Sequence, residues 1–298
     1  MSPETARVKS AVVGVRPTSK FVPCENYGMD GGCGVNGWSI VTAAPPSAGF
    51  AGILAGFLFT GLMYLFGKSQ SKALPPVIAL FSATFLILGL TSYLFTRVAG
   101  FKGPDTLLCR RMWMEGMVAS GMLAAGSASL VVGLSYLLSE FDPNDAPYLD
   151  RLAVIISGGV LIGAPVLLLF TSFSFYEQLG ISLSPLVYGA SGCGVCVLLF
   201  VAFVCYKLTH HSAKTDTRQK WIAFTSYLVA SYAIIGPVFA SAIIRLPSEW
   251  IADPYPWLFA ATLVVALAFP ALVMVGLAGG AAGGDDNLRR PEVEQSPW

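Results

Sequence analysis

Seven long apolar runs divide the chain, and their lengths constrain its fold more than any motif does. Each run holds about twenty residues or more, which at about 1.5 Å rise per residue matches a hydrocarbon core about 30 Å thick. None of them carries a charged residue in its interior. They predict an all-α, polytopic transmembrane helical bundle with seven spans, or six if one run does not cross. The runs cover residues 48–67, 75–96, 117–139, 152–176, 186–206, 221–244 and 255–278.

The composition supports the same class and excludes several partners. Only 12% of the 298 residues are charged, whereas a soluble domain carries about a quarter. The formal net charge is +1, so no basic surface for nucleic acid is expected. The partners that remain are membrane lipids and other membrane proteins.

The sequence outside the apolar runs predicts two tails around one transmembrane domain. Residues 1–47 are polar and contain no apolar signal-peptide core, so we expect the first span to be an uncleaved anchor. Pro45 and Pro46 are expected to break the chain just before that span. The transmembrane domain is predicted over 48–279, and residues 280–298 are predicted to be disordered.

Basic residues next to the spans favour an orientation with the N-terminus outside and the C-terminus in the cytoplasm of a plasma membrane. In that orientation the inner side holds Lys68, Lys72, Arg151, Lys207, Lys214, Arg218, Lys220, Arg289 and Arg290. The outer side holds fewer, namely Arg97, Lys102, Arg110, Arg111 and Arg245. Counting the four basic residues far out in the N-terminal tail would remove the difference.

Small residues repeat every four positions in the third run, which places them on one helical face. They are Gly121, Ala125, Ser129 and Gly133. Hydrophobicity cannot draw helices together in lipid, so such ridges supply the close contacts. The ridge predicts packing within the bundle or, alternatively, the interface of a homo-oligomer.

Three prolines lie inside predicted spans, at Pro165, Pro237 and Pro270. Proline removes a helical hydrogen bond and bends the helix. Such bends are fixed features of a bundle or, alternatively, they open a cavity between spans four, six and seven. The polar side chains expected to line that cavity are Ser172, Tyr176, Ser231 and Tyr232.

Six cysteines are present, and four of them suggest redox chemistry. Cys193 and Cys196 form a Cys-x-x-Cys pair, and Cys24 and Cys33 lie in the tail on the same predicted side, as does Cys109. A tail dithiol beside a membrane dithiol resembles the layout of quinone-linked thiol oxidoreductases of the vitamin K epoxide reductase and DsbB type. The resemblance implies electron relay from Cys24–Cys33 to Cys193–Cys196. Alternatively, the membrane pair is a packing element and Cys24–Cys33 is a structural disulfide.

Other charged residues lie near the span ends. One set on the predicted outer side could bind an anionic lipid headgroup, or its members could simply snorkel to the interface. It comprises Arg97, Arg110, Arg111, Glu115, Glu177 and Arg245. No ionisable residue is expected to be buried. Neither a metal nor a cofactor is predicted, because Cys205, His210 and His211 lack the spacing of a metal site and residues 255–278 contain no lysine for retinal.

These patterns favour a non-enzymatic accessory, sensor or lipid-interacting membrane protein. A transporter or lipid handler with a cavity between bent helices is the first alternative. A thiol oxidoreductase using Cys193 and Cys196 is the second.

Overall fold

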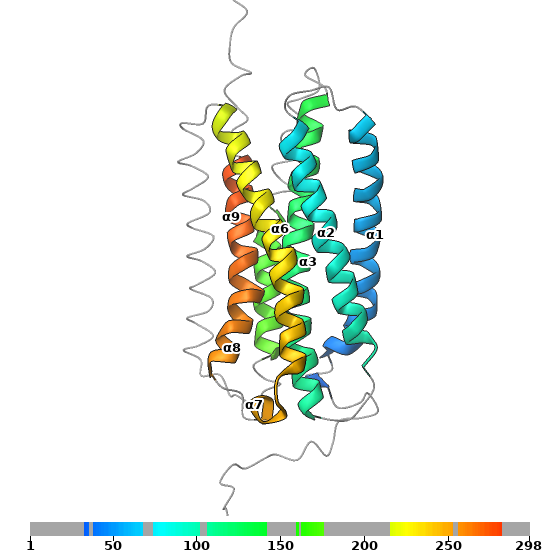
Figure 1. Cartoon of the computed structure of the whole chain (residues 1–298), viewed down its shortest axis with the longest axis vertical. Helices are drawn as coiled ribbons and strands as arrows, with labels where there is room; N and C mark the ends of the chain where they lie inside the picture. The colour runs from blue at the N-terminus through cyan, green and yellow to red at the C-terminus, as the bar shows by residue number, and fades with distance from the viewer. Residues whose placement is uncertain are drawn as a thin grey trace, which may run out of the picture.

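A computed structural model of the chain is a bundle of long helices that lie side by side along the long axis of the molecule (Figure 1). It describes residues 33–35, 38–67, 74–101, 106–141, 159–160, 162–175, 215–252 and 256–281. The long helices are α1 (Ile40–Gly67), α2 (Leu74–Ala99), α3 (Thr106–Phe141) and α6 (Thr215–Arg245). The last apolar run forms α8 (Pro256–Leu263), the π-helical segment η1 (Val264–Ala268) and α9 (Phe269–Ala281).

The smaller elements lie at the ends of these helices. The strands β1 (Gly34–Val35) and β2 (Trp38–Ser39) form an antiparallel pair just before α1. The short helix α7 (Ser248–Ala252) follows α6. A further apolar helix, Ile162–Phe175, lies between α3 and α6 in the sequence.

Within the described residues, five helices are long and apolar enough to cross a membrane. They are Ile40–Gly67, Pro75–Ala99, Leu107–Leu137, Lys220–Arg245 and Ala260–Ala278. The predicted class, a helical bundle with membrane-length apolar helices, is therefore confirmed. The count of seven is not confirmed, because Ile162–Phe175 is shorter than a span and the run at 186–206 lies outside the described residues.

The first helix begins earlier than predicted. Pro45 and Pro46 lie inside α1 and do not precede it. Each proline removes one backbone hydrogen bond but has a backbone φ that suits a helix. Burial outweighs that loss, since Ile40 and Ala44 at the start of α1 are almost completely buried, and tertiary packing decides most helix ends.

The third helix also begins earlier than predicted, at Thr106 and not at residue 117. Arg110, Arg111 and Glu115 therefore lie on the helix and not on a flanking loop. The expectation that no ionisable residue is buried is wrong, because Glu115 is 0% exposed. The burial of Glu115 was not predicted because its charged partner, Arg97, comes from another helix.

Helix α3 is the centre of the bundle. The buried share of its span is 72%, against 28% for α1. The small-residue ridge packs inside the bundle: Ala125 and Ser129 are fully buried, Gly121 faces the carbonyl of Ala266, and Gly133 faces the ring of Phe81. The ridge is thus filled within one chain, and self-association stays a prediction.

The last span contains an irregular turn just before Pro270. The N–H of Phe269 donates to the carbonyl of Val264, five residues back, which is the π-helical pattern. Pro270 has no N–H to donate to the carbonyl of Ala266. That carbonyl and the hydroxyl of Tyr232 both lie against Gly121, and the Tyr232 ring stacks on Phe269 at 5.3 Å between centroids.

The outward faces of the helices are apolar. Phe57 is 71% exposed and Ile234 is 62% exposed, and many large apolar side chains share this exposure. A surface of this kind would cause aggregation in water, whereas the hydrocarbon core of a membrane solvates it. The apolar helices and their apolar outward faces therefore indicate a membrane-embedded protein.

Gly121 provides a test of the close packing at the centre of the bundle. A methyl group at this position would collide with the Ala266 carbonyl and lie 2.6 Å from the Tyr232 hydroxyl. We expect Gly121→Ala to lower the free energy of unfolding by about 1–3 kcal/mol, the usual cost of overpacking. Gly56→Ala is the matched control, because nothing lies within 4 Å of its new methyl group. Thermal unfolding in detergent measures both, and equal stability of the two variants would contradict the packing described.

Candidate functional site

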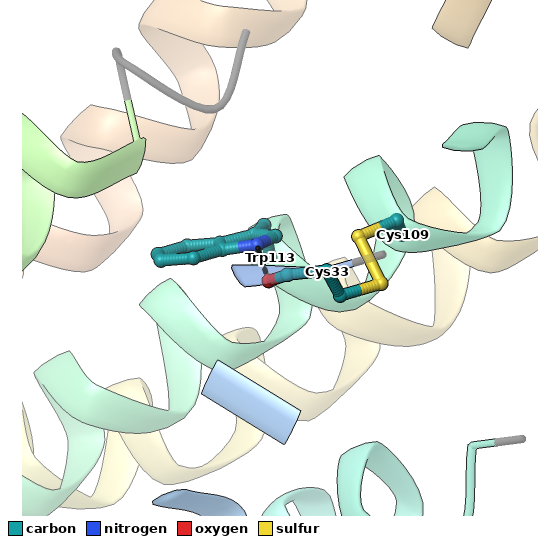
Figure 2. Close-up of a disulfide and its surroundings, with 3 residues drawn as sticks. All are labelled: Cys33, Cys109 and Trp113. Atoms are coloured by element: carbon teal, nitrogen blue, oxygen red, sulfur yellow. Dashed lines mark hydrogen bonds between the residues drawn. A yellow bond between two sulfur atoms is a disulfide. The ribbon is translucent and has the colours of Figure 1, made fainter. Parts of the chain in front are cut away.

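A disulfide fastens the start of the described chain to α3 (Figure 2). Cys33 is bonded to Cys109, with 5.5 Å between the two Cα atoms. The indole Nε1 of Trp113 donates to the carbonyl oxygen of Cys33 at 3.1 Å. Both cysteines and Trp113 are almost completely buried. The peptide before α1 is therefore held against the bundle by one covalent bond and one hydrogen bond.

This disulfide corrects the predicted pairing of cysteines. Cys33 is bonded to Cys109, so it cannot also pair with Cys24. The other redox candidates, Cys24, Cys193 and Cys196, lie outside the described residues. The pairing could not be read from the sequence, since 76 positions separate the two cysteines and only the fold brings them together.

Aromatic rings surround the disulfide on the bundle side. Trp113 contacts Trp38 of β2 edge to face, at 5.3 Å between ring centroids. Its other neighbour is Phe175, at 6.4 Å. The cluster joins β2, α3 and the end of helix Ile162–Phe175, so it fixes three segments that are distant in the sequence.

The predicted charged residues gather at this same end of the bundle. Arg97 lies near the end of α2, and its Nε is 3.3 Å from Oε1 of the buried Glu115 on α3. Its Nη1 also lies 3.5 Å from the hydroxyl of Ser241 on α6. The ring of Tyr93 lies 5.7 Å from the guanidinium carbon. Three helices thus meet around one arginine.

The neighbouring arginines bind backbone carbonyls. Arg111 Nη2 donates to the carbonyl of Leu246, just after α6, at 2.8 Å. Arg110 Nη1 donates to the carbonyl of Ile251 in α7 at 3.1 Å. Cations near helix C-termini satisfy carbonyls that have no helical donor. Both side chains therefore donate hydrogen bonds to the backbone of the protein itself and hold the turn after α6 in place.

The remaining two members of the predicted set are placed differently. Arg245 is exposed at the last residue of α6. Glu177 lies outside the described residues. The structure places Arg97, Arg110, Arg111 and Glu115 at one end of the bundle, where each contacts another group of the protein.

A cavity of about 650 Å³ lies elsewhere, in a groove between the first halves of α2 and α6. This volume is within the range of small-molecule sites, about 300–1,000 Å³. The lining is mostly apolar, with four polar side chains at Ser82, Lys220, Ser226 and Tyr227. The rest of the lining consists of Pro75, Pro76, Ala79, Ala83, Leu86, Ala223 and Ala230.

The predicted cavity residues do not line this groove. Ser172 is buried and donates to the carbonyl of Leu168 at 2.7 Å. Ser231 is exposed on α6, and its neighbour Tyr232 is buried among α3, α6 and α9. Tyr176 lies outside the described residues. Span six, as α6, thus lines the described cavity together with α2, and not together with spans four and seven.

Two short stripes in the sequence carry a signal for the groove. Small residues recur three or four positions apart at Ala79, Ser82 and Ala83 on α2, and at Ala223 and Ser226 on α6. Residues at this spacing share a helical face. Facing stripes of small residues leave room between two helices where larger side chains would fill it.

The described residues include no group of three or more His, Cys, Asp or Glu side chains that could hold a metal ion. Cys205, His210 and His211 lie outside them. No protein-family model matches the chain, no curated protein matches it, and no solved structure matches it. The proposals for function therefore rest on the residues and geometry given above.

The disulfide can be tested by peptide mapping. Trypsin should release residues 21–68 linked to residues 103–110 under non-reducing conditions, because these peptides contain Cys33 and Cys109. We expect the link to survive Cys24→Ser and to vanish in Cys109→Ser. Loss of the bond should lower the free energy of unfolding by about 2–4 kcal/mol, since it closes a long loop. A link that disappears with Cys24→Ser would contradict the assigned pairing.

Proposed function

We propose that this chain is a non-enzymatic lipid-interacting membrane protein that holds an anionic phospholipid between α2 and α6. The observation that carries the proposal is the groove of about 650 Å³ between these helices. Its apolar wall suits an acyl chain. Lys220, at one end of the groove, suits an anionic headgroup.

The positions of these groups along the helices fit an amphiphile. Lys220 and Pro75 lie at the starts of α6 and α2, whereas Leu86 and Ala230 lie three turns further along. Lys220 is an exposed residue on the groove lining, and a lysine near a membrane surface attracts anionic headgroups by about 1 kcal/mol. The occupant therefore has its charge near the helix starts and its chain beside Ala83 and Ala230.

The disulfide supports a proposal for orientation. Disulfides persist on the oxidising side of a membrane, so we place Cys33 and Cys109 outside the cell. The starts of α2 and α6 are at the opposite end of the bundle from the start of α3 (Figure 1). The groove then opens toward the inner leaflet of the plasma membrane, with the N-terminus outside and the C-terminus inside.

The thiol oxidoreductase remains a weaker candidate. Exchange requires a thiolate to reach one sulfur of a disulfide, but Cys33 is 3% exposed and Cys109 is 1% exposed. The relay also required a Cys24–Cys33 disulfide in the tail, and Cys33 is bonded to Cys109 instead. The groove is the better supported site.

Filling the groove tests the binding site. A phosphatidylglycerol with a photoreactive acyl chain should label peptides from both α2 and α6. We expect Ala230→Trp to reduce labelling about tenfold, because the indole occupies the space of the chain, and a tenfold loss corresponds to about 1.4 kcal/mol. Ala242→Trp is the control, since Ala242 is exposed on the same helix and is not part of the lining. Equal labelling of both variants would refute the site.

The headgroup is tested by removing charge. We expect Lys220→Gln to reduce the preference for phosphatidylglycerol over phosphatidylcholine about fivefold, which corresponds to about 1 kcal/mol for one basic residue. Arg245→Gln, at the opposite end of α6, should leave the preference unchanged. Competition between the two lipids in the labelling assay measures it. An unchanged preference in Lys220→Gln would argue against an anionic headgroup there.

Orientation is tested by labelling introduced cysteines in intact cells. The exposed positions Ser248, in α7, and Gly67, at the end of α1, lie at opposite ends of the bundle. In a background with the four cysteines other than Cys33 and Cys109 replaced by serine, an impermeant maleimide should label Ser248→Cys directly. It should label Gly67→Cys only after the membrane is permeabilised. The reverse pattern would overturn the orientation.

A further inference from the structure

The Arg97 side chain of α2 contacts Glu115 of α3 and Ser241 of α6, and so links three helices at the proposed outer end of the bundle. Arg97 belongs to α2 and Glu115 to α3, and Ser241 of α6 lies 3.5 Å from the Arg97 guanidinium. The groove lies between the opposite halves of α2 and α6, which run in the same direction (Figure 1). The two helices are therefore joined at one end and separated at the other.

The pair is poorly compensated for a buried charge. Glu115 is completely buried, and among the described residues neither of its carboxylate oxygens accepts a hydrogen bond. In the same part of the chain its charged contact is Arg97, whose side chain is 27% exposed and also faces the Tyr93 ring. Buried ion pairs stabilise a fold only when further hydrogen bonds satisfy both partners. The ion pair is therefore not expected to stabilise the fold strongly. A contact that forms and breaks during function would show the same incomplete hydrogen bonding.

A bend point lies between the pair and the groove. Pro237 is inside α6, after the groove residue Ala230 and before Ser241. It cannot donate a hydrogen bond to the carbonyl of Ala233, so the helix is locally weaker there. The helix can therefore bend at Pro237 when the contact at Arg97 is released, which changes the angle between the inner half of α6 and α2.

We propose that the Arg97–Glu115 pair is a latch that sets the width of the α2–α6 groove and thereby the release of the lipid bound in it. This inference rests on the proposed function. While the pair is formed, α2, α3 and α6 are held at their outer ends and the groove stays narrow. When it is broken, α6 leans away from α2 at the inner end and the lipid leaves faster. Arg97 and Glu115 are positioning residues, because neither lines the groove.

The test replaces the pair by apolar residues of similar size, in the double variant R97M/E115L. Such replacements of buried ion pairs usually preserve stability, so the double variant should fold. Arg97→Met alone leaves Glu115 buried without a counter-ion and should lose the most thermal stability. Arg245→Met is the control for an arginine at the same end that is outside the pair.

Two readouts separate a latch from a structural contact. The first is the rate at which phosphatidylglycerol leaves the full-length protein in phosphatidylcholine nanodiscs, which should rise about tenfold or more in R97M/E115L at wild-type thermal stability. The second is the distance between spin labels at Ala79→Cys and Tyr227→Cys, which should increase or broaden in the same background. The four cysteines outside the Cys33–Cys109 disulfide are replaced by serine for this measurement.

The outcomes distinguish the latch from the lipid site. A stable R97M/E115L protein with unchanged release and unchanged label distance would overturn the latch and leave the lipid site standing. If wild-type protein bound no phosphatidylglycerol, the lipid site would fail. The label distance would then still decide whether the pair sets the separation of α2 and α6. Release that changes equally in Arg245→Met would also overturn the latch, because the effect would follow from lost surface charge.

Discussion

Close approach of backbones to α3 is the constraint on which the rest of the bundle depends. Lipid is as apolar as the helices, so burial of apolar surface does not bring them together. Here the contacts are made where a side chain is missing. Gly121 admits a carbonyl of η1, Gly126 admits the side chain of Leu88 from α2, and Gly236 of α6 receives Met122 from α3. Each contact depends on the absence of one Cβ, which explains why α3 can be surrounded by helices on several sides.

The polar contacts at the disulfide end of the bundle follow from this central helix. Because α3 extends to Thr106, it carries Arg110, Arg111 and Glu115 into a region crowded by α2 and α6. All three side chains meet groups of the protein itself: Glu115 pairs with Arg97, and the two arginines donate to backbone carbonyls. The same extension brings Cys109 within bonding distance of Cys33. If α3 began only at residue 117, where its apolar run begins, it could not make these contacts.

Hydropathy predicted the class of fold and the cores of the described long helices, because membrane crossing depends on local composition and length. It failed at the helix ends. Pro45 and Glu115 are poor signals for a continuing helix, and each is accommodated by a contact with a distant part of the sequence. Ile40, in the turn before Pro45, lies against Gly116 of α3, and Glu115 pairs with Arg97. The cysteine pairing failed for the same reason. Four members of the predicted charged set lie at one end of the bundle, but two of its arginines donate to backbone carbonyls.

The two ends of the bundle differ in a way that bears on function. At the end of the bundle that carries the disulfide, a tryptophan hydrogen bond and several arginine contacts also cross between elements. At the opposite end, the described lining of the groove between α2 and α6 is mainly alanine, proline and serine. Pro237 lies between these two regions, and the hydrogen bond that it cannot donate makes it a point at which α6 can bend. The proposed change in the width of the groove therefore relies on a bend that the sequence of α6 itself supplies, whichever lipid occupies the groove.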